Sequence, residues 1–278
     1  MRFLVLAVIT CLLGTQLAAE QLFGRDVVIT DARHDRGARA PLVIVMHGFL
    51  GTPEEIRRSS GFDRVARANG LVVVYPSGLR RRWNDGRSPA NETYDVGFLT
   101  QLVSSFVSDG RADLSQVYAV GHSNGGGMAM RLACDRPNLL AGIAVVATKV
   151  PSAYTCPQGL PVPAIFIHGT LDPIAPHVGR PGGARLGATM SAADGMATWQ
   201  QRNRCGASRV VQTIDTQNDG TAVQVIDYAG CTAALRYLLI EGHGHGWPRQ
   251  RARATRLLGP ATQELDASSA IWQFFGQL

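Results

Sequence analysis

Runs of apolar and β-branched residues recur along the chain, and most of them end at or near a glycine. Runs this continuous are typical of strands that are buried on both faces, as in a parallel sheet. They cover residues 41–48, 71–78, 117–123, 141–148, 163–170 and 235–242. The pattern therefore predicts six central strands.

Segments with helical spacing of their apolar residues separate these runs. Residues 53–70 begin with a proline and two acidic residues and end at a glycine, which are signals for the start and end of a helix. Comparable segments cover 95–110, 126–137 and 267–278. Strands that alternate with helices predict an α/β fold with a mostly parallel central sheet and helices on both faces.

The first nineteen residues have a different pattern. Arg2 is followed by a nearly continuous apolar stretch over residues 3–13, and small residues lead to Ala19. This order predicts a secretory signal peptide over residues 1–19 that is cleaved near Ala19. The apolar stretch is too short for a stable membrane span, although a retained anchor or a buried segment is the alternative. We therefore expect a secreted protein, extracellular or periplasmic, with no stable membrane insertion after cleavage.

The remaining chain shows neither an internal repeat nor a low-complexity linker. We therefore expect residues 20–278 to form a single domain. Within it, residues 176–234 are richer in glycine, arginine and other polar residues than their surroundings. We expect this stretch to form a partial cap or insertion that contains a small hairpin.

The composition is that of a globular protein, with 45% hydrophobic and 17% charged residues. The formal net charge is +6, and Lys149 is the single lysine among 27 basic residues. The arginines are scattered except in short runs such as 249–256, so we expect solvated loops and no nucleic-acid partner. Attraction to an acidic polymer substrate is the weaker alternative.

Four cysteines follow the predicted signal peptide: Cys134, Cys156, Cys205 and Cys231. An even number in an exported chain predicts two disulfides, for which three pairings are open. We favour Cys134–Cys156 and Cys205–Cys231 because each closes a short loop. No spacing typical of zinc ligands is present, so we expect no metal. We expect no cofactor either, because the predicted mechanism needs only protein groups.

The segment "GHSNG" fits the G-x-S-x-G pattern and places Ser123 where a predicted strand meets a predicted helix. A serine on such a sharp turn is held in a strained conformation with its hydroxyl above the carboxyl end of the sheet. Small residues at Gly121 and Gly125 would allow the strand and the helix to pass closely. A tight turn without chemistry is the alternative for this pentapeptide taken alone.

A serine nucleophile needs a base, and the base needs a carboxylate that orients it. Asp172 directly follows one apolar run, and His243 and His245 follow the next one. The order serine, acid, histidine is that of α/β-hydrolases, and all three positions lie at the carboxyl ends of strands. The sequence therefore predicts Ser123 and Asp172 as catalytic residues, with His243 competing with His245. His122 is expected to point away from the site.

The oxyanion of such a reaction needs two backbone donors. One is expected at Asn124, directly after the nucleophile, and the other at Phe49, in the loop that follows the first apolar run. Trp83 and Asn84 lie in a loop that we expect to overhang the site, where an aromatic ring could stack on the substrate. A half-buried packing role for Trp83 is the equally weighted alternative.

The chain resembles the α/β-hydrolase esterases grouped as extracellular polyhydroxybutyrate depolymerase and feruloyl esterase-like proteins, over nearly all of the mature sequence. The motifs are "HG", "YPSG", "DVGFL", "GHSNGG", "RLACDRP", "HGTLDPIAP" and "GHGWP". The resemblance implies an α/β-hydrolase fold and places the catalytic histidine two residues before the Trp-Pro pair, at His245. It also implies a disulfide between Cys134 and Cys156. Many members carry cysteine where this chain has Phe49. Trp247 of that pair is a further expected substrate contact.

These features together predict a secreted serine ester hydrolase that acts through an acyl-enzyme. The expected substrates are hydroxybutyrate or hydroxyalkanoate oligomers, or feruloyl and acetyl esters of plant saccharides, between which fold and triad do not choose. A peptidase of the same fold is the first alternative, although the chain shows no gating domain. A non-catalytic binding protein is the second, although the full set of catalytic residues speaks against it.

Overall fold

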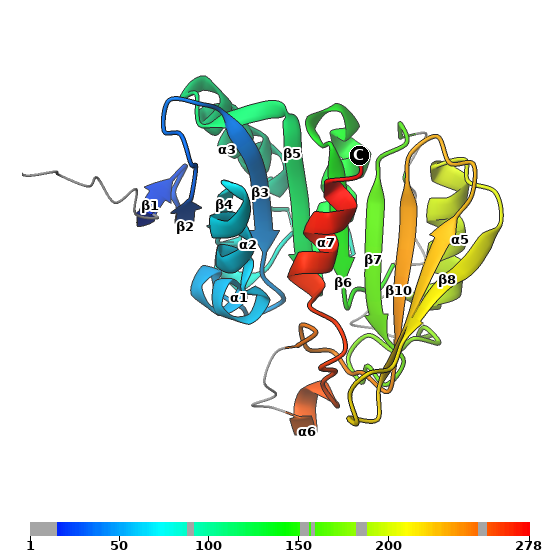
Figure 1. Cartoon of the computed structure of the whole chain (residues 1–278). Helices are drawn as coiled ribbons and strands as arrows, with labels where there is room; N and C mark the ends of the chain where they lie inside the picture. Colours follow the sequence, from blue (N-terminus) through cyan, green and yellow to red (C-terminus); the bar gives the residue numbers. More distant parts are fainter. Residues whose placement is uncertain (1–15, 88–91, 151–155, 157–158, 182–187, 250–254) are drawn as a thin grey trace, which may run out of the picture.

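The computed structural model describes residues 16–87, 92–150, 156, 159–181, 188–249 and 255–278. Its centre is a sheet in which ten strands follow the order β1-β2-β4-β3-β5-β6-β7-β10-β9-β8. The strands are β1 (Gln16–Leu22), β2 (Arg25–Asp31), β3 (Ala40–Met46), β4 (Val72–Pro76), β5 (Ala112–His122), β6 (Gly142–Val146), β7 (Ala164–Gly169), β8 (Ser208–Ile214), β9 (Ala222–Tyr228) and β10 (Leu235–Glu241). The carboxyl ends of the central strands point to the bottom of Figure 1, where α1 and α6 lie.

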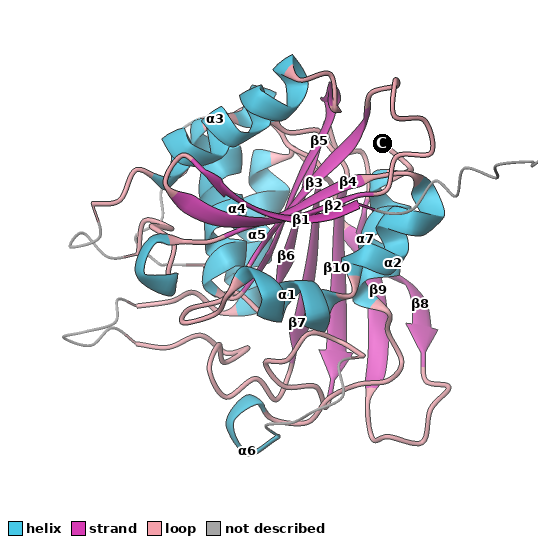
Figure 2. Cartoon of the chain, turned by 90° about the vertical axis from the view of Figure 1, so that its left-hand side faces the viewer, coloured by secondary structure: helices cyan, strands magenta, loops and turns pink. Residues whose placement is uncertain are grey.

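Helices cover both faces of the sheet (Figures 1 and 2). They are α1 (Pro53–Ser60), α2 (Phe62–Asn69), α3 (Asp95–Ser108), α4 (Asn124–Asp135), α5 (Ala192–Arg202), α6 (Thr255–Leu258) and α7 (Ala267–Phe275). One core contains apolar residues of α3, α4 and α5, and the other contains those of α1, α2 and α7. Alternate residues of β3 enter the two cores, Ile44 on one side and Val45 on the other. The sheet is therefore buried on both faces, which explains its continuous apolar strands.

The six predicted strands are the six that pair in parallel at the centre of the sheet: β4, β3, β5, β6, β7 and β10. The four outer strands pair in antiparallel fashion. The expected hairpin within residues 176–234 is β8–β9, and it extends the sheet beside β10 rather than standing over the site. Every residue of β8 but the last is exposed, so this edge strand lacks the apolar run that marks a buried one.

Residues 53–70 form two helices where the sequence pattern predicted one. Gly61 separates them with φ of 66°, a left-handed conformation that ends α1 and favours glycine. Thr52 and Glu55 form a capping box that fixes the start of α1. Both helices still cover the same core.

Both favoured disulfides are present. Cys134 at the end of α4 is joined to Cys156, with 5.5 Å between the Cα atoms. Cys205 is joined to Cys231 and ties the end of α5 to the connection between β9 and β10. The closed loops span 22 and 26 residues, which in the chain-entropy description are each worth about 3 kcal/mol.

The predicted signal peptide lies largely outside the described residues, which begin at residue 16. Residues 16–22 pair with β2 as strand β1, so the expected cleavage near Ala19 falls within this strand. Among the helices that the structure describes, none has the length and apolar character that crossing a bilayer requires.

Candidate active site

Ser123 forms the turn between β5 and α4. Its φ of 54° and ψ of −118° are strained for a residue with a side chain. The Ser123 N–H donates to the carbonyl of Val146 at 2.8 Å, and the Ser123 carbonyl accepts from Gly127 N–H at 3.1 Å and Thr148 Oγ1 at 2.9 Å. These contacts hold the strained backbone in place, as a nucleophile elbow requires.

Glycines allow the elbow to be this tight. A Cβ atom on Gly121 would overlap the backbone of Gly125. A Cβ atom on Gly125 would in turn overlap the carbonyls of Met46 and His47 at the end of β3. The steric need expected from the sequence is therefore present, and it fixes α4 against two strands of the sheet.

His245 and Asp172 meet at the carboxyl end of the sheet. The distance from His245 Nδ1 to Asp172 Oδ2 is 2.7 Å, and the two residues are only 4% and 3% exposed. Asp172 Oδ1 accepts from the N–H groups of Ile174 at 2.8 Å and Ala175 at 2.6 Å. Burial raises the pKa of Asp172, but the hydrogen bonds and the attraction to His245 outweigh it, so that its pKa is lowered. An ionised Asp172 only accepts, so His245 donates from Nδ1 and keeps Nε2 available as a base.

His243 has a different setting from His245. Its Nδ1 accepts from Thr262 N–H at 3.1 Å, and its Nε2 donates to the carbonyl of Gly246 at 3.0 Å. Both ring nitrogens are thus used to shape the loop after β10. Burial lowers the pKa of His243, which keeps the ring neutral for this role. Of the two candidates, His245 is the one in contact with Asp172.

His122 has a contact that the sequence analysis missed. Its Nε2 is 2.7 Å from the carbonyl oxygen of His245, and the two rings lie 5.1 Å apart. Since a carbonyl only accepts, Nε2 of His122 carries the proton. Burial first, and then repulsion from His245, lower the pKa of His122 to about 4. Although it was expected to face away, His122 lines the same cleft as Ser123 and contacts the loop after β10.

The loop after β3 lies directly against the elbow. A Cβ atom on Gly48 would be 3.3 Å from Cβ of Ser123. Within the described part of the chain, the backbone N–H groups of Phe49 and Asn124 have no hydrogen-bond partner, so both can donate to an oxyanion. Asn124 also begins α4, whose N-terminus favours negative charge.

The buried rings of His47 and Trp83 form hydrogen bonds that fix the loop after β3. His47 donates from Nδ1 to the carbonyl of Gly48 at 2.7 Å and accepts at Nε2 from Gly78 N–H at 2.9 Å. Burial lowers the pKa of His47 and so favours the neutral ring that this pattern needs. Trp83 Nε1 donates to the carbonyl of His47 at 3.0 Å.

The structure does not place Trp83, Asn84 and Trp247 where a substrate could touch them. Their exposed fractions are 2%, 9% and 2%, and none of them lines the cleft around Ser123. The backbone N–H of Trp83 donates to Asn124 Oδ1 at 2.7 Å, and the Trp247 ring packs edge-on against Phe62. Their large apolar surfaces stabilise the loops, so the alternative of a packing role is the one that fits Trp83.

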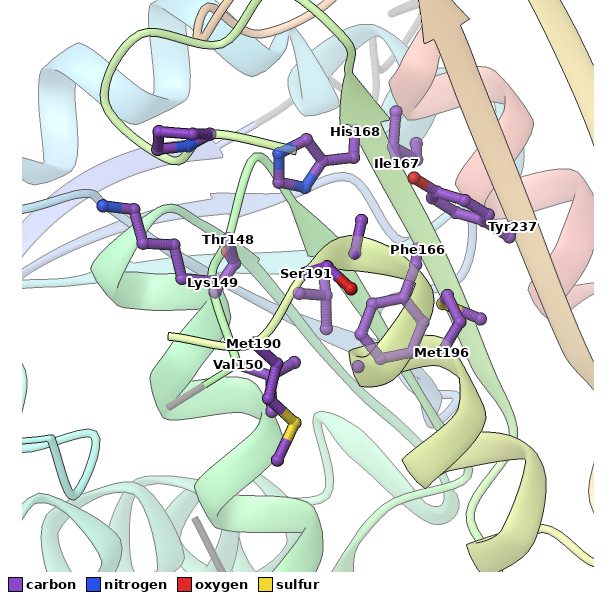
Figure 3. A pocket seen from close by; sticks show the side chains of 14 residues that line it. Thr148, Lys149, Val150, Phe166, Ile167, His168, Met190, Ser191, Met196 and Tyr237 are labelled. Atoms are coloured by element: carbon purple, nitrogen blue, oxygen red, sulfur yellow. The ribbon is translucent and has the colours of Figure 1, made fainter. Parts of the chain in front are cut away.

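Two of the hollows among the described residues lie close to the predicted site residues, and their sizes differ. The cleft that contains Ser123 and His245 has a volume of about 1270 Å³ and opens along α1. Figure 3 shows the other hollow, which is lined by Phe166, His168 and Tyr237 among others. Its volume of about 20 Å³ suits one water molecule and excludes a substrate. No group of three metal-binding side chains occurs among the described residues.

Comparisons with known proteins identify relatives of the chain. A sequence model of the family described as "Putative esterase" matches residues 27–223. The "Putative esterase NocK" of Nocardia uniformis subsp. tsuyamanensis is 38% identical over 145 residues, 50% of this chain and 42% of the relative. The poly(3-hydroxybutyrate) depolymerase of Ralstonia pickettii is 34% identical over 144 residues, 47% of this chain and 29% of the relative. The chain thus spans less than half the length of these two relatives.

Longer alignments reach more distant proteins. A probable feruloyl esterase C of Aspergillus terreus is 25% identical over 264 residues, 92% of this chain and 85% of the relative. The solved structure of an acetyl xylan esterase from Aspergillus awamori superposes with a TM-score of 0.64 and 16% identity, over 95% of this chain and all of that one. The latter shows a shared fold, the α/β-hydrolase fold expected from the sequence. By its matched family model, the chain belongs to this esterase family.

Proposed function

We propose that the chain is a secreted serine carboxylic ester hydrolase that acts through an acyl-enzyme. The observation that carries the proposal is the 2.7 Å contact between His245 Nδ1 and Asp172 Oδ2, at a cleft that His245 lines together with Ser123. A serine on a strained turn, a histidine and a buried carboxylate are the parts that such a reaction needs. The predicted signal peptide and the two disulfides support export.

In the proposed mechanism, Ser123 Oγ attacks the ester carbonyl carbon while His245 Nε2 takes the serine proton. The N–H groups of Phe49 and Asn124 donate to the oxyanion, and each such donor is typically worth about 10²–10³ in rate. The C–O bond to the alcohol then breaks, and His245 gives its proton to the leaving oxygen. Water, deprotonated by His245, cleaves the acyl-enzyme and regenerates Ser123. Asp172 stabilises the imidazolium of His245 during both acylation and deacylation.

The relatives suggest the range of substrates. Their names refer to poly(3-hydroxybutyrate), feruloyl esters and acetyl xylan. We propose hydroxyalkanoate oligomers or feruloyl and acetyl esters of plant saccharides for this chain. Its cleft of about 1270 Å³ is open enough for an oligomer.

The test is turnover of p-nitrophenyl acetate, methyl ferulate and a 3-hydroxybutyrate trimer by the purified chain and by Ser123→Ala. The variant is expected to lose about 10⁴-fold or more in kcat, because the nucleophile is removed. Ser104→Ala on the exposed side of α3 is the control and should keep full activity. Turnover that survives in Ser123→Ala would overturn the proposal.

A further inference from the structure

The cleft is strongly asymmetric in charge. Next to Ser123 it is lined by buried or uncharged groups, whereas the wall formed by α1, α2 and the segment after β10 carries Arg58, Arg64 and Arg249. We call these three residues the arginine wall. Binding sites for small molecules are mostly apolar with few polar groups, so three guanidinium groups in one cleft need an explanation.

Internal ion pairs neutralise only part of the arginine wall. Arg64 and Arg249 share one carboxylate, Asp266, with Arg249 Nη1 3.7 Å from it. Glu55 also lines the cleft, but it accepts from the Thr52 N–H at 3.0 Å and lies 3.8 Å from an arginine outside the cleft. The wall therefore has more positive than negative charge.

Arg58 is the least constrained member of the wall. It is exposed near the end of α1, and within the described residues its side chain takes part in no ion pair and no hydrogen bond. A guanidinium presents its donors in a fork that matches a carboxylate in bidentate fashion. Its position in the cleft that holds Ser123 makes the bound ester the molecule best placed to supply that carboxylate.

We propose that the arginine wall selects esters that carry a carboxylate away from the bond to be cleaved, with Arg58 as its main contact. This inference rests on the proposed function, because it assigns a substrate class to the same site. Two sources share this chemistry: the free acid end of a hydroxyalkanoate oligomer, and a uronic acid residue of an acylated saccharide. Excess positive charge in a cleft also concentrates anionic substrates there.

The test compares each acid with its neutral amide. One pair is the 3-hydroxybutyrate trimer and the same trimer with a terminal amide. The other is an acetylated methyl glucuronoside and its uronamide. The chain is expected to favour the acid of at least one pair by about fivefold in kcat/KM at low salt, and the preference should shrink as salt screens the charges. The pair that shows the preference identifies the source of the carboxylate.

Variants tie the preference to Arg58. Arg58→Gln should lower kcat/KM about two- to fivefold for the acid and leave the amide unchanged, as expected for an exposed ion pair. Arg58→Lys should keep most of the preference because the charge remains. Arg209→Gln on the exposed strand β8, far along the sheet from the cleft, is the matched control.

The outcomes separate the two proposals. Equal turnover of acid and amide in both pairs, unchanged in Arg58→Gln, would overturn the inference and leave the proposed ester hydrolysis standing. Failure to cleave any of these esters or p-nitrophenyl acetate, with the fold intact, would overturn the proposed function and the inference together. A preference that Arg58→Gln removes and Arg209→Gln does not would support both.

Discussion

Two regions meet at the cleft, and they are built differently. One is the arginine wall, and the other is the set of proposed catalytic residues Ser123, Asp172 and His245, which we call the catalytic edge. Asp172 and His245 are almost fully buried, and the polar atoms of the acid are held by defined donors. The side chains of Arg64 and Arg249 are each 61% exposed and share one partner. Because water and salt screen exposed charges, each contact of the wall is worth far less than one of the catalytic edge. A mutation in the catalytic edge should therefore lower kcat by orders of magnitude, whereas a mutation in the arginine wall should change the preference for acid substrates only a few-fold.

The largest expected effect is at the catalytic edge. Asp172→Asn should lower kcat on p-nitrophenyl acetate about 10⁴-fold, because an amide neither stabilises the imidazolium nor fixes the tautomer of His245. Asp113→Asn, at an exposed carboxylate of β5, is the matched control and should change kcat less than twofold. A loss below about tenfold in Asp172→Asn would remove this residue from the mechanism.

The next largest effect is on the free energy of unfolding, and it is seen by comparing substitutions at two glycines. Gly121→Ala should lower the free energy of unfolding by about 3 kcal/mol, because its Cβ would overlap the backbone of Gly125. Gly61→Ala between α1 and α2 meets no atom within 4 Å, and its left-handed φ should cost only about 1–2 kcal/mol. Urea unfolding measures both. Equal losses would mean that the backbone around Gly121 has room for a Cβ atom.

A pH effect of similar size is expected from His122. Its pKa is about 4 in the fold and near 6.5 when unfolded, so the unfolded chain binds more protons between these values. The contribution is fully present above about pH 6.5 and is lost as the pH falls, reaching about 3 kcal/mol at pH 4. His245, Asp172 and His243 are the titratable groups around it.

Unfolding of His122→Gln between pH 7 and pH 4 tests this contribution. The variant should show a shallower fall of the unfolding free energy than the unchanged chain, since its side chain does not titrate. His34→Gln, at an exposed histidine, is the control. Parallel pH curves for the unchanged chain and His122→Gln would contradict the neutral state of this half-buried ring.

The smallest expected effect is that of Arg58→Gln, which should lower kcat/KM on the acid substrates about two- to fivefold, less so at high salt. It sharpens the comparison because the same Arg58→Gln variant should leave kcat on p-nitrophenyl acetate unchanged. A large loss on that neutral ester would place Arg58 with the catalytic edge and remove the distinction between the two regions.

The sequence predicted the elements that are buried on both faces. Central strands such as β3 and β6 are continuous apolar runs, so their positions and their parallel pairing follow from the pattern. The exposed strand β8 leaves no such run, and it was expected only as part of a small hairpin. The break at Gly61 was missed because the apolar spacing continues through it from Ile56 to Val65.

The candidate site divides in the same way. Ser123, Asp172 and the pair His243 and His245 could be proposed because each follows a strand, and strand ends are readable from the chain. The choice of His245 within that pair came from the family resemblance. The partner of His122 lies 123 residues further on, and that of the Trp83 indole lies 36 residues before it. No local pattern indicates that such rings are bound to distant carbonyls, so their role as supports could not be predicted, although packing of Trp83 was one of its two predicted roles.

The positions of two buried tryptophans have a practical consequence. The Trp83 indole is hydrogen-bonded to the carbonyl of His47 at the start of the loop after β3, and the Trp247 ring, in the loop after β10, lies 6.3 Å from that of His122. Intrinsic fluorescence of the chain should therefore respond when either loop rearranges. Trp83 and Trp247 thus serve as intrinsic fluorescent probes near Ser123. Ligand titrations can be followed without an added label.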